Sequence, residues 1–239
     1  MIDEAMEATL IIILLTAVGT FGWYAVGILV RGRCDRRLGR RFHRQGVLAL
    51  TYDDGPGPAT TPELLDLLAD QDAKATFFLI GRSAEQAPQL VSRIADEGHT
   101  IAWHTQVHRN QWKTDPVRGL ADLRLPSALR EPPGGRIRLF RPPYGKMTLG
   151  TALACLCSGW RIITWTRPSG DTLDPLPDVD EFVQQIDDDG GGVVLMHDMD
   201  RDDPARARFV LDSTAALIRL ARRRGWRIIH SPEDWGRFS

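Results

Sequence analysis

The chain has few cysteines, and their arrangement excludes two common kinds of site. Its 239 residues include three cysteines, Cys34, Cys155 and Cys157. An odd number argues against a framework of structural disulfides, and the spacing does not match a cysteine cluster that binds zinc. Cys155 and Cys157 lie in an apolar segment, so we expect them to be small core residues of a buried helix.

The chain also lacks an excess of charge, a low-complexity segment and an internal repeat. Its formal net charge is −1, which does not favour a nucleic acid as a partner. Hydrophobic residues make up 43% of the sequence, enough for a sizeable core. The length fits one large domain with an appendage.

The appendage is an apolar segment near the N-terminus. Ala8 to Val30 is an uncharged stretch of roughly 23 residues, and about 20 suffice to cross a bilayer. Its start is acidic and no cleavage site follows, so it does not have the pattern of a signal peptide. We therefore predict a single transmembrane helix, with residues 1–30 as a membrane anchor.

A basic segment follows the predicted anchor. Residues 31–44 form a juxtamembrane linker that contains seven arginines. Basic flanks favour the cytoplasmic side of a membrane, so the pattern predicts a single-pass protein of the cell membrane with residues 45–239 in the cytoplasm. Arginines in such a linker also contact anionic lipid headgroups.

From Val47 onward, short apolar runs alternate with helical patterns. This alternation is typical of a parallel α/β sheet or barrel. The predicted strands are Val47–Thr51, Ala75–Ile80, Thr100–Trp103, Arg136–Arg141, Arg161–Trp165, Gly192–His197 and Trp226–His230. The predicted helices are Thr61–Asp72, Ala84–Glu97, Pro116–Arg130, Thr148–Ser158, Val179–Asp188 and Val210–Arg224.

Side chains that can carry chemistry follow these strands. Asp53 and Asp54 come where the first predicted strand emerges into a loop, a place where catalytic groups are commonly mounted. His104 and His108 are four positions apart, so one helical turn would point both the same way. Two histidines and one aspartate can bind a divalent metal and leave positions open for water and substrate. The second aspartate is then free to act as a base.

Two further segments complete a set of four motifs. Arg141-Pro142-Pro143-Tyr144-Gly145 follows one predicted strand, and Leu195-Met196-His197-Asp198 ends another. With Thr51-Tyr52-Asp53-Asp54-Gly55-Pro56 and His104-Thr105-Gln106-Val107-His108, they resemble the motifs of the polysaccharide deacetylase family, in the family's order. The family has a NodB homology domain and is similar to carbohydrate esterase family 4. The resemblance covers residues 45–235 and implies an irregular (β/α) barrel of about seven parallel strands over residues 45–239.

The resemblance implies a metal centre and a substrate. Asp54, His104 and His108 match the family's ligands for one divalent ion, usually zinc. The implied activity is hydrolysis of N-acetyl groups on N-acetylhexosamine residues of an oligo-, poly- or lipid-linked saccharide. The partners expected are therefore this saccharide and, through the N-terminal helix, a membrane.

The resemblance also implies the catalytic roles. Asp53 matches the general base, and Arg141 matches the arginine that holds this base. Tyr144 matches the residue whose backbone N–H helps to bind the oxyanion. His197 matches the general acid that gives a proton to the departing amine.

The chain departs from the family pattern after the fifth predicted strand. The family usually has Asp-x-x-Asp-Trp there, and the first aspartate tunes the catalytic histidine. In this chain Thr166 or Arg167 stands at that position. Asp171 and Asp198 are two candidates to support His197, and the sequence does not choose between them.

Two tryptophans lie near the histidines in the sequence. Trp103 directly precedes His104, and Trp112 follows His108. Either is a candidate for stacking on a sugar ring, although tryptophan in an apolar context is more often a core residue.

Three alternative functions remain open at this stage. One is a deformylase or an O-acetyl esterase that acts on a lipid-linked sugar or glycan, since an ester needs a weaker general acid. A second treats Asp54, His104 and His108 as the facial triad of a non-haem Fe(II) oxygenase. The third is an inactive, membrane-tethered relative that only binds glycans.

Overall fold

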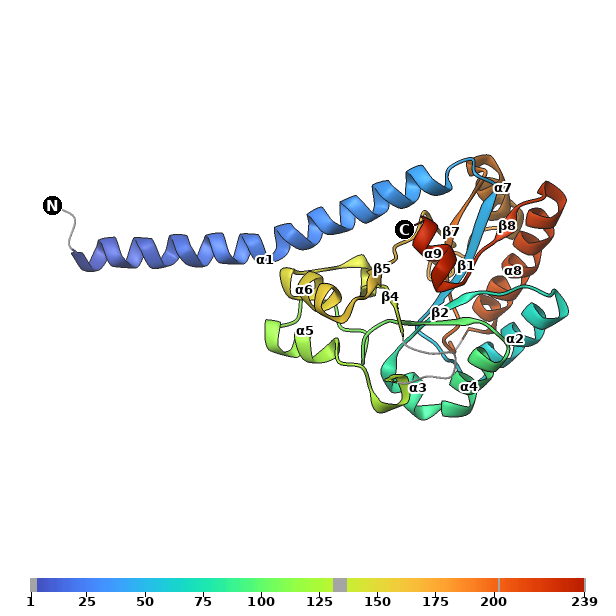
Figure 1. Ribbon diagram of the computed structural model, residues 1–239, viewed down its shortest axis with the longest axis horizontal. Coiled ribbons are helices and arrows are strands. Elements are labelled where there is room, and N and C mark those ends of the chain that lie inside the picture. The colour runs from blue at the N-terminus through green and yellow to red at the C-terminus, as the bar shows by residue number, and fades with distance from the viewer. Residues whose placement is uncertain (1–3, 131–136, 202, 239) are drawn as a thin grey trace.

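A parallel sheet forms the centre of the computed structural model, which describes residues 4–130, 137–201 and 203–238. Its strands are hydrogen-bonded in the order β5-β4-β3-β2-β1-β7-β6, and β8 pairs with β1. The seven strands of this path form a half-barrel covered by helices (Figure 1). The predicted α/β barrel of about seven parallel strands is therefore confirmed.

The two longest strands are neighbours and set the position of the site. β1 (Val47–Asp53) and β7 (Gly191–His197) pair in parallel from Val47 opposite Gly191 to Asp53 opposite His197. Both are almost wholly buried, which agrees with their continuous apolar sequences. The other strands are β2 (Thr76–Leu79), β3 (Thr100–Trp103), β4 (Leu139–Phe140), β5 (Arg161–Ile162), β6 (Arg167–Pro168) and β8 (Arg227–Ile228).

Helices connect the strands. They are α1 (Glu4–Phe42), α2 (Thr60–Asp70), α3 (Gly81–Gln86), α4 (Pro88–Asp96), α5 (Pro116–Asp122), α6 (Leu149–Ser158), α7 (Val179–Asp189), α8 (Pro204–Arg224) and α9 (Pro232–Phe238), with 3-10 turns η1 (Ser127–Leu129) and η2 (Pro143–Gly145). The limits of α6 follow from its sequence. Thr148 and Thr151 form a capping box at its start, and Gly159 ends it in the left-handed conformation, at φ 67°.

Three predicted helices were wrong in extent, and one of them, α8, begins at Pro204 instead of Val210. The segment Ala84–Glu97 forms two helices, because the chain leaves helical geometry at Ala87 (φ −132°) and Pro88 then begins α4. The segment Pro116–Arg130 is helical only to Asp122 and resumes briefly as η1.

The strand predictions need smaller corrections. Arg136, the predicted start of a strand, lies outside the described residues, and β4 begins at Leu139. β5 ends at Ile162 rather than Trp165. The sequence analysis did not identify β6, a two-residue strand that pairs with β7.

α1 extends beyond the predicted anchor. Its first part projects from the rest of the protein (Figure 1) and is long and apolar enough to cross a membrane. Its last part, predicted as a linker, is helical and packs on the domain, with Leu38 and Phe42 only 1% and 0% exposed. Phe42 lies against Trp235, with 6.1 Å between ring centroids. The division of the chain at residues 30 and 44 stays a prediction.

Candidate active site

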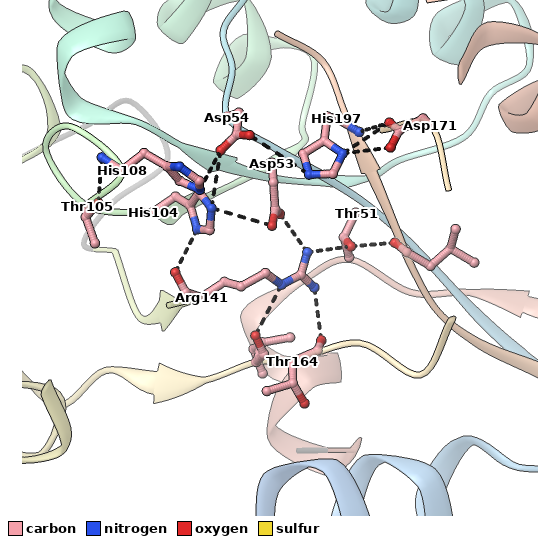
Figure 2. A network of polar contacts seen from close by, with 12 residues as sticks. Thr51, Asp53, Asp54, His104, Thr105, His108, Arg141, Thr164, Asp171 and His197 are labelled. Atoms are coloured by element: carbon pink, nitrogen blue, oxygen red, sulfur yellow. Dashed lines mark hydrogen bonds and ion pairs between the residues drawn. The ribbon is translucent and has the colours of Figure 1, made fainter. Parts of the chain in front are cut away.

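The predicted site residues meet where the parallel strands end. β1 ends at Asp53, the loop after β3 carries His104 and His108, β4 leads into Arg141, and β7 ends at His197. Parallel strands bring all their carboxyl ends to one edge of the sheet, which is where α/β proteins place their sites. Figure 2 shows these side chains converging.

Asp54, His104 and His108 form a group that can hold a metal ion. Their ligand atoms all lie within 4.8 Å of one another. Asp54 Oδ1 is 3.4 Å from His104 Nε2 and 3.2 Å from His108 Nε2. His104 Nδ1 lies 2.7 Å from the carbonyl oxygen of Arg141, to which it can donate, so Nε2 is left as the ligand atom.

An unpartnered buried oxygen supports this assignment. Asp54 Oδ1 is buried and has no hydrogen-bond partner in the described part of the chain. An orphaned carboxylate oxygen between two imidazole nitrogens fits a divalent cation, and two nitrogens with one oxygen suit zinc. The donor set thus fits the predicted ion, although it does not identify the metal.

The charges around Asp54 favour its ionised form. Burial alone would raise the pKa of Asp54, but the histidines around it, led by His104, hold this pKa well below its usual range. Burial lowers the pKa of His108, and the charge of His104 adds to this effect. Burial also opposes a charge on His104, but Asp53 and Asp54 outweigh it and raise the pKa of His104. A metal ion bound here would compete with a proton for His104.

The two histidines are not on a helical turn, contrary to the prediction. Residues 104–108 form a loop in which Thr105 and His108 have positive φ, 71° and 58°. The Thr105 hydroxyl accepts a hydrogen bond from the backbone N–H of His108 at 3.1 Å. The histidine rings lie 5.0 Å apart as a result. Their common direction was correctly predicted, but a loop produces it.

Asp53 is held by the buried guanidinium of Arg141. Arg141 Nη1 donates to Asp53 Oδ1 at 2.7 Å and to the Thr51 hydroxyl at 2.8 Å. Its Nε and Nη2 donate to the carbonyl oxygens of Ile163 and Thr164, at 3.2 and 3.0 Å. Asp53 Oδ2 is left facing the metal ligands, 3.7 Å from His104 Nε2.

Asp171, not Asp198, contacts the His197 side chain. Its carboxylate accepts from the His197 backbone N–H at 2.8 Å and lies 2.9 Å from Nδ1. Burial opposes a charge on His197, but Asp171 outweighs it and raises the pKa of the imidazole. Nε2 then faces Asp54 Oδ2 at 3.9 Å. Asp198 instead accepts from the Thr61 hydroxyl at 2.7 Å, away from the imidazole.

The two residues at the missing aspartate position do not contact the site. The Thr166 hydroxyl accepts from the backbone N–H of Val193 at 2.9 Å, and Arg167 pairs with Asp189 at 2.6 Å. The first contact joins the residue before β6 to β7, and the second joins β6 to the end of α7. Asp171 follows this strand, which explains how it reaches His197.

The two tryptophans do not lie in the cleft beside the site. Trp103 is 0% exposed and donates to the carbonyl oxygen of Leu123, so its predicted sugar contact is wrong in this structure. Trp112 is partly exposed, but its ring contacts Lys146 and Tyr24. The cleft is about 360 Å³, and Asp54, His108 and Met199 are among its lining residues. This volume is in the range of small-ligand sites.

Tyr144 and a residue of α1 lie at the edge of the site. Tyr144 is exposed, with its ring 4.6 Å from that of His108, and it has a positive φ of 55°. Arg31 donates to the carbonyl oxygen of the next residue, Gly145, at 2.8 Å. Its guanidinium also lies over the Trp165 ring, 4.6 Å from the centroid. Arg31 belongs to the predicted linker, and no sequence motif indicates its contact with this turn.

Comparison with known proteins gives one family. A family model described as polysaccharide deacetylase matches residues 41–155. A chitooligosaccharide deacetylase of Sinorhizobium fredii is 34% identical over 185 residues, which cover 72% of this chain and 82% of that protein. A peptidoglycan-N-acetylglucosamine deacetylase of Bacillus cereus is 37% identical over 134 residues, but the match spans 55% of this chain and only 47% of that relative.

Solved structures give the same result. A peptidoglycan N-acetylglucosamine deacetylase is similar with a TM-score of 0.69 and 28% identity, covering 80% of this chain and 88% of that one. A family 4 carbohydrate esterase from Streptomyces lividans, solved with acetate, has a TM-score of 0.67 and 29% identity, covering 79% of this chain and 95% of that one.

The two adjacent aspartates predict different effects on metal content. Asp54→Asn removes a charged ligand, so bound zinc should fall to a small fraction of the wild-type amount. Asp53→Asn should keep zinc near the wild-type level, because Asp53 is engaged by Arg141. Metal analysis of each purified protein after chelation and reloading measures this difference. Loss of zinc from both variants would show that the division of roles between the aspartates is wrong.

Proposed function

Because the chain belongs to the polysaccharide deacetylase family, we propose that it is a metal-dependent hydrolase that removes N-acetyl groups from N-acetylhexosamine residues of a glycan. The arrangement of Asp53 and His197 close to Asp54 and its two histidines carries this proposal. One carboxylate and one imidazole are available for proton transfer, and amide hydrolysis needs a base and an acid.

Asp53 is positioned as the general base. A divalent ion held by Asp54, His104 and His108 would supply a water whose pKa is lowered towards about 7. Asp53 takes the proton of the attacking water through Oδ2, since Oδ1 is occupied by Arg141. Arg141 also places a buried guanidinium 2.7 Å from this carboxylate, which fixes the direction in which Oδ2 points.

His197 is positioned as the general acid. Its Nδ1–H is bound to Asp171, so the ring cannot turn, and Nε2 faces the centre of the site. A proton on Nε2 passes to the amide nitrogen as the carbon–nitrogen bond breaks, because an amine leaves far more readily than its anion. The missing first aspartate predicted a weaker general acid, which favoured an esterase. Because Asp171 supports His197 instead, this reason for preferring an esterase no longer holds.

Tyr144 is positioned to stabilise the oxyanion through its backbone N–H. Its φ of 55° turns the peptide out of the regular path. Arg31 holds the same turn through the carbonyl oxygen of Gly145. We assign Arg31 the role of a positioning residue that acts through this turn and touches no substrate.

The substrate we propose is a saccharide at a membrane surface. Curated relatives are named for chitooligosaccharide and peptidoglycan, both of which contain N-acetylated sugars. α1 would anchor the enzyme, so that a lipid-linked saccharide or a glycan close to the membrane is within reach. The arginines after residue 30 favour the cytoplasmic side for the catalytic domain.

The proposed activity predicts metal-dependent release of acetate. The full chain in detergent should release acetate from N-acetylglucosamine oligomers, lose this activity on chelation and regain it with zinc. Asp53→Asn should abolish release while the metal stays bound. Acetate is measured by an enzyme-coupled assay. No release from a folded, zinc-loaded protein, on these oligomers or on lipid-linked N-acetylated sugars, would contradict the assignment.

The role of His197 predicts a dependence on the leaving group. His197→Ala should slow hydrolysis of the acetamide by roughly 10²–10⁴-fold, the usual contribution of an acid or base. It should slow hydrolysis of 4-nitrophenyl acetate far less, because nitrophenolate leaves without a proton. The ratio of kcat/KM for the two substrates measures the effect. Equal losses would exclude His197 as the general acid.

If Arg31 holds the turn that carries Tyr144, substituting Arg31 in α1 should lower kcat. Arg31→Gln removes a charged hydrogen bond, of a kind that contributes about 1.5–3 kcal/mol, so kcat should fall by roughly tenfold or more with little change in KM. Arg31→Lys should recover part of the loss. Arg219→Gln, which removes an exposed arginine from α8, is the matched control. Equal activity of Arg31→Gln and the control would exclude this role.

A further inference from the structure

α6 has an exposed apolar surface that the catalytic site does not require. The helix Leu149–Ser158 contains no charged residue. Its side chains Leu153 and Leu156 are 50% and 78% exposed. At the same end of the protein, Val117 and Leu120 of α5 are exposed too. Large apolar side chains gathered on one surface indicate a contact with a protein or a membrane.

This apolar surface is continuous with the apolar part of α1. α1 and α6 pack side by side (Figure 1), so closely that a Cβ at Gly150 would lie 2.7 Å from the Trp23 ring. A Cβ at Gly27 would lie 2.0 Å from the carbonyl oxygen of Met147. Ile28 and Leu29 of α1 nevertheless remain 52% and 66% exposed. The apolar side chains of both helices thus face the same surroundings.

Arginines begin where the apolar surface ends. A groove of about 960 Å³ runs between the last part of α1 and the segment from α6 to β5. Six arginines line it: Arg33, Arg36, Arg37, Arg40, Arg41 and Arg161. No acidic residue is among its lining residues in the described chain, and Arg33, Arg36 and Arg37 have no ion pair with a described residue. The lining of the groove is therefore positively charged.

We propose that the face formed by α1 and α6 docks the catalytic domain on the bilayer, with Leu153 and Leu156 among the acyl chains and Arg33, Arg36 and Arg37 on the phosphates of anionic lipids. This inference rests on the proposal that α1 spans a membrane. The apolar surface continues into the part of α1 that would span the membrane, so the occupant we infer is a bilayer. The arginines that follow are positively charged, so the headgroups we infer are anionic.

The dimensions of the helix agree with this placement. At 1.5 Å per residue, Arg33 to Arg37 lie about 4–10 Å beyond Val30 along α1. The headgroup layer extends roughly 5–8 Å beyond the hydrocarbon on each side, and arginine side chains reach back towards it. Leu156 lines the groove together with Val30, the last residue of the apolar stretch, so it lies where the hydrocarbon would give way to headgroups.

Cys157 provides a probe of the apolar face, because it is an exposed thiol on α6 next to Leu156. The full chain with Cys34→Ser and Cys155→Ala is labelled at Cys157 with an environment-sensitive fluorophore and placed in nanodiscs that hold one copy each. The label should shift to the blue and resist quenching by iodide. The matched control carries the label at Arg223→Cys on α8, with Cys157→Ser added, where quenching should be severalfold stronger.

The outcomes separate the inference from the proposed function. A single copy in each disc means that protection comes from lipid and not from a second copy of the chain. Equal quenching at both positions in an inserted chain would overturn the docking surface and leave the anchor and the acetate assay untouched. A chain that does not enter the discs at all would overturn the anchor and the docking surface together.

The arginine groove is tested by headgroup binding. The full chain in neutral detergent is titrated with dihexanoyl phosphatidylglycerol, dihexanoyl phosphatidylcholine or inorganic phosphate, and only the first should bind tightly. Arg33→Gln/Arg36→Gln/Arg37→Gln should weaken this binding by roughly a hundredfold. Arg219→Gln/Arg222→Gln/Arg223→Gln on α8 makes the same change in charge and should not. Inorganic phosphate binding as tightly as the lipid, or equal binding by both triple variants, would overturn the lipid assignment.

Discussion

The buried ion pair between Arg141 and Asp53 is the interaction on which the rest of the site depends. The guanidinium is 0% exposed and uses its donors on Asp53, Thr51 and the carbonyl oxygens of residues 163 and 164. These partners belong to β1 and to the segment after β5, so one side chain joins elements that the sheet order separates by three strands. Breaking such a pair costs about 3–5 kcal/mol, because the remaining charge stays buried without a partner. The same contact leaves one oxygen of Asp53 free to face Asp54 and the two histidines, so the stability of the fold and the orientation of this carboxylate have a common origin.

This ion pair also connects the site to α1. The Trp165 ring lies close to two guanidinium groups, with its centroid 4.6 Å from that of Arg31 and 5.8 Å from that of Arg141. Arg31 is held in turn by Asp35 at 2.8 Å. α1 is therefore more than a tether attached to an independent domain. Its last turns bury Leu38 and Phe42 in the core, and its middle supports the turn that carries Tyr144. A fragment that begins after residue 44 would lack all these contacts.

The parallel sheet could be predicted from the sequence, because it follows from the apolar runs and their alternation with helical patterns. The position of the motif residues at one edge of the sheet could be predicted too, because each motif follows a strand. Contacts that depend on loop paths could not be predicted. Two loops show this. A loop, not a helical turn, brings His104 and His108 together, and the segment after β6 places Asp171 rather than Asp198 against His197. Trp103 shows that closeness to a candidate metal ligand in the sequence does not place a residue in the site. Its position beside a ligand suggested a sugar contact, but the alternation of a buried strand points it into the core, where it is 0% exposed.

The backbone of the site departs from regular geometry for a physical reason. Of the six described non-glycine residues with positive φ, four lie here: Asp54, Thr105, His108 and Tyr144. Each such residue costs about 1–2 kcal/mol. Successive side chains of a strand point to opposite faces, so a regular strand would separate the carboxylates of Asp53 and Asp54. A φ of 74° at Asp54 turns the second carboxylate back beside the first (Figure 2). The strain is therefore the cost of bringing the carboxylates of Asp53 and Asp54 to one point, and a cation shared by Asp54 and His108 would join two of the strained residues and offset it.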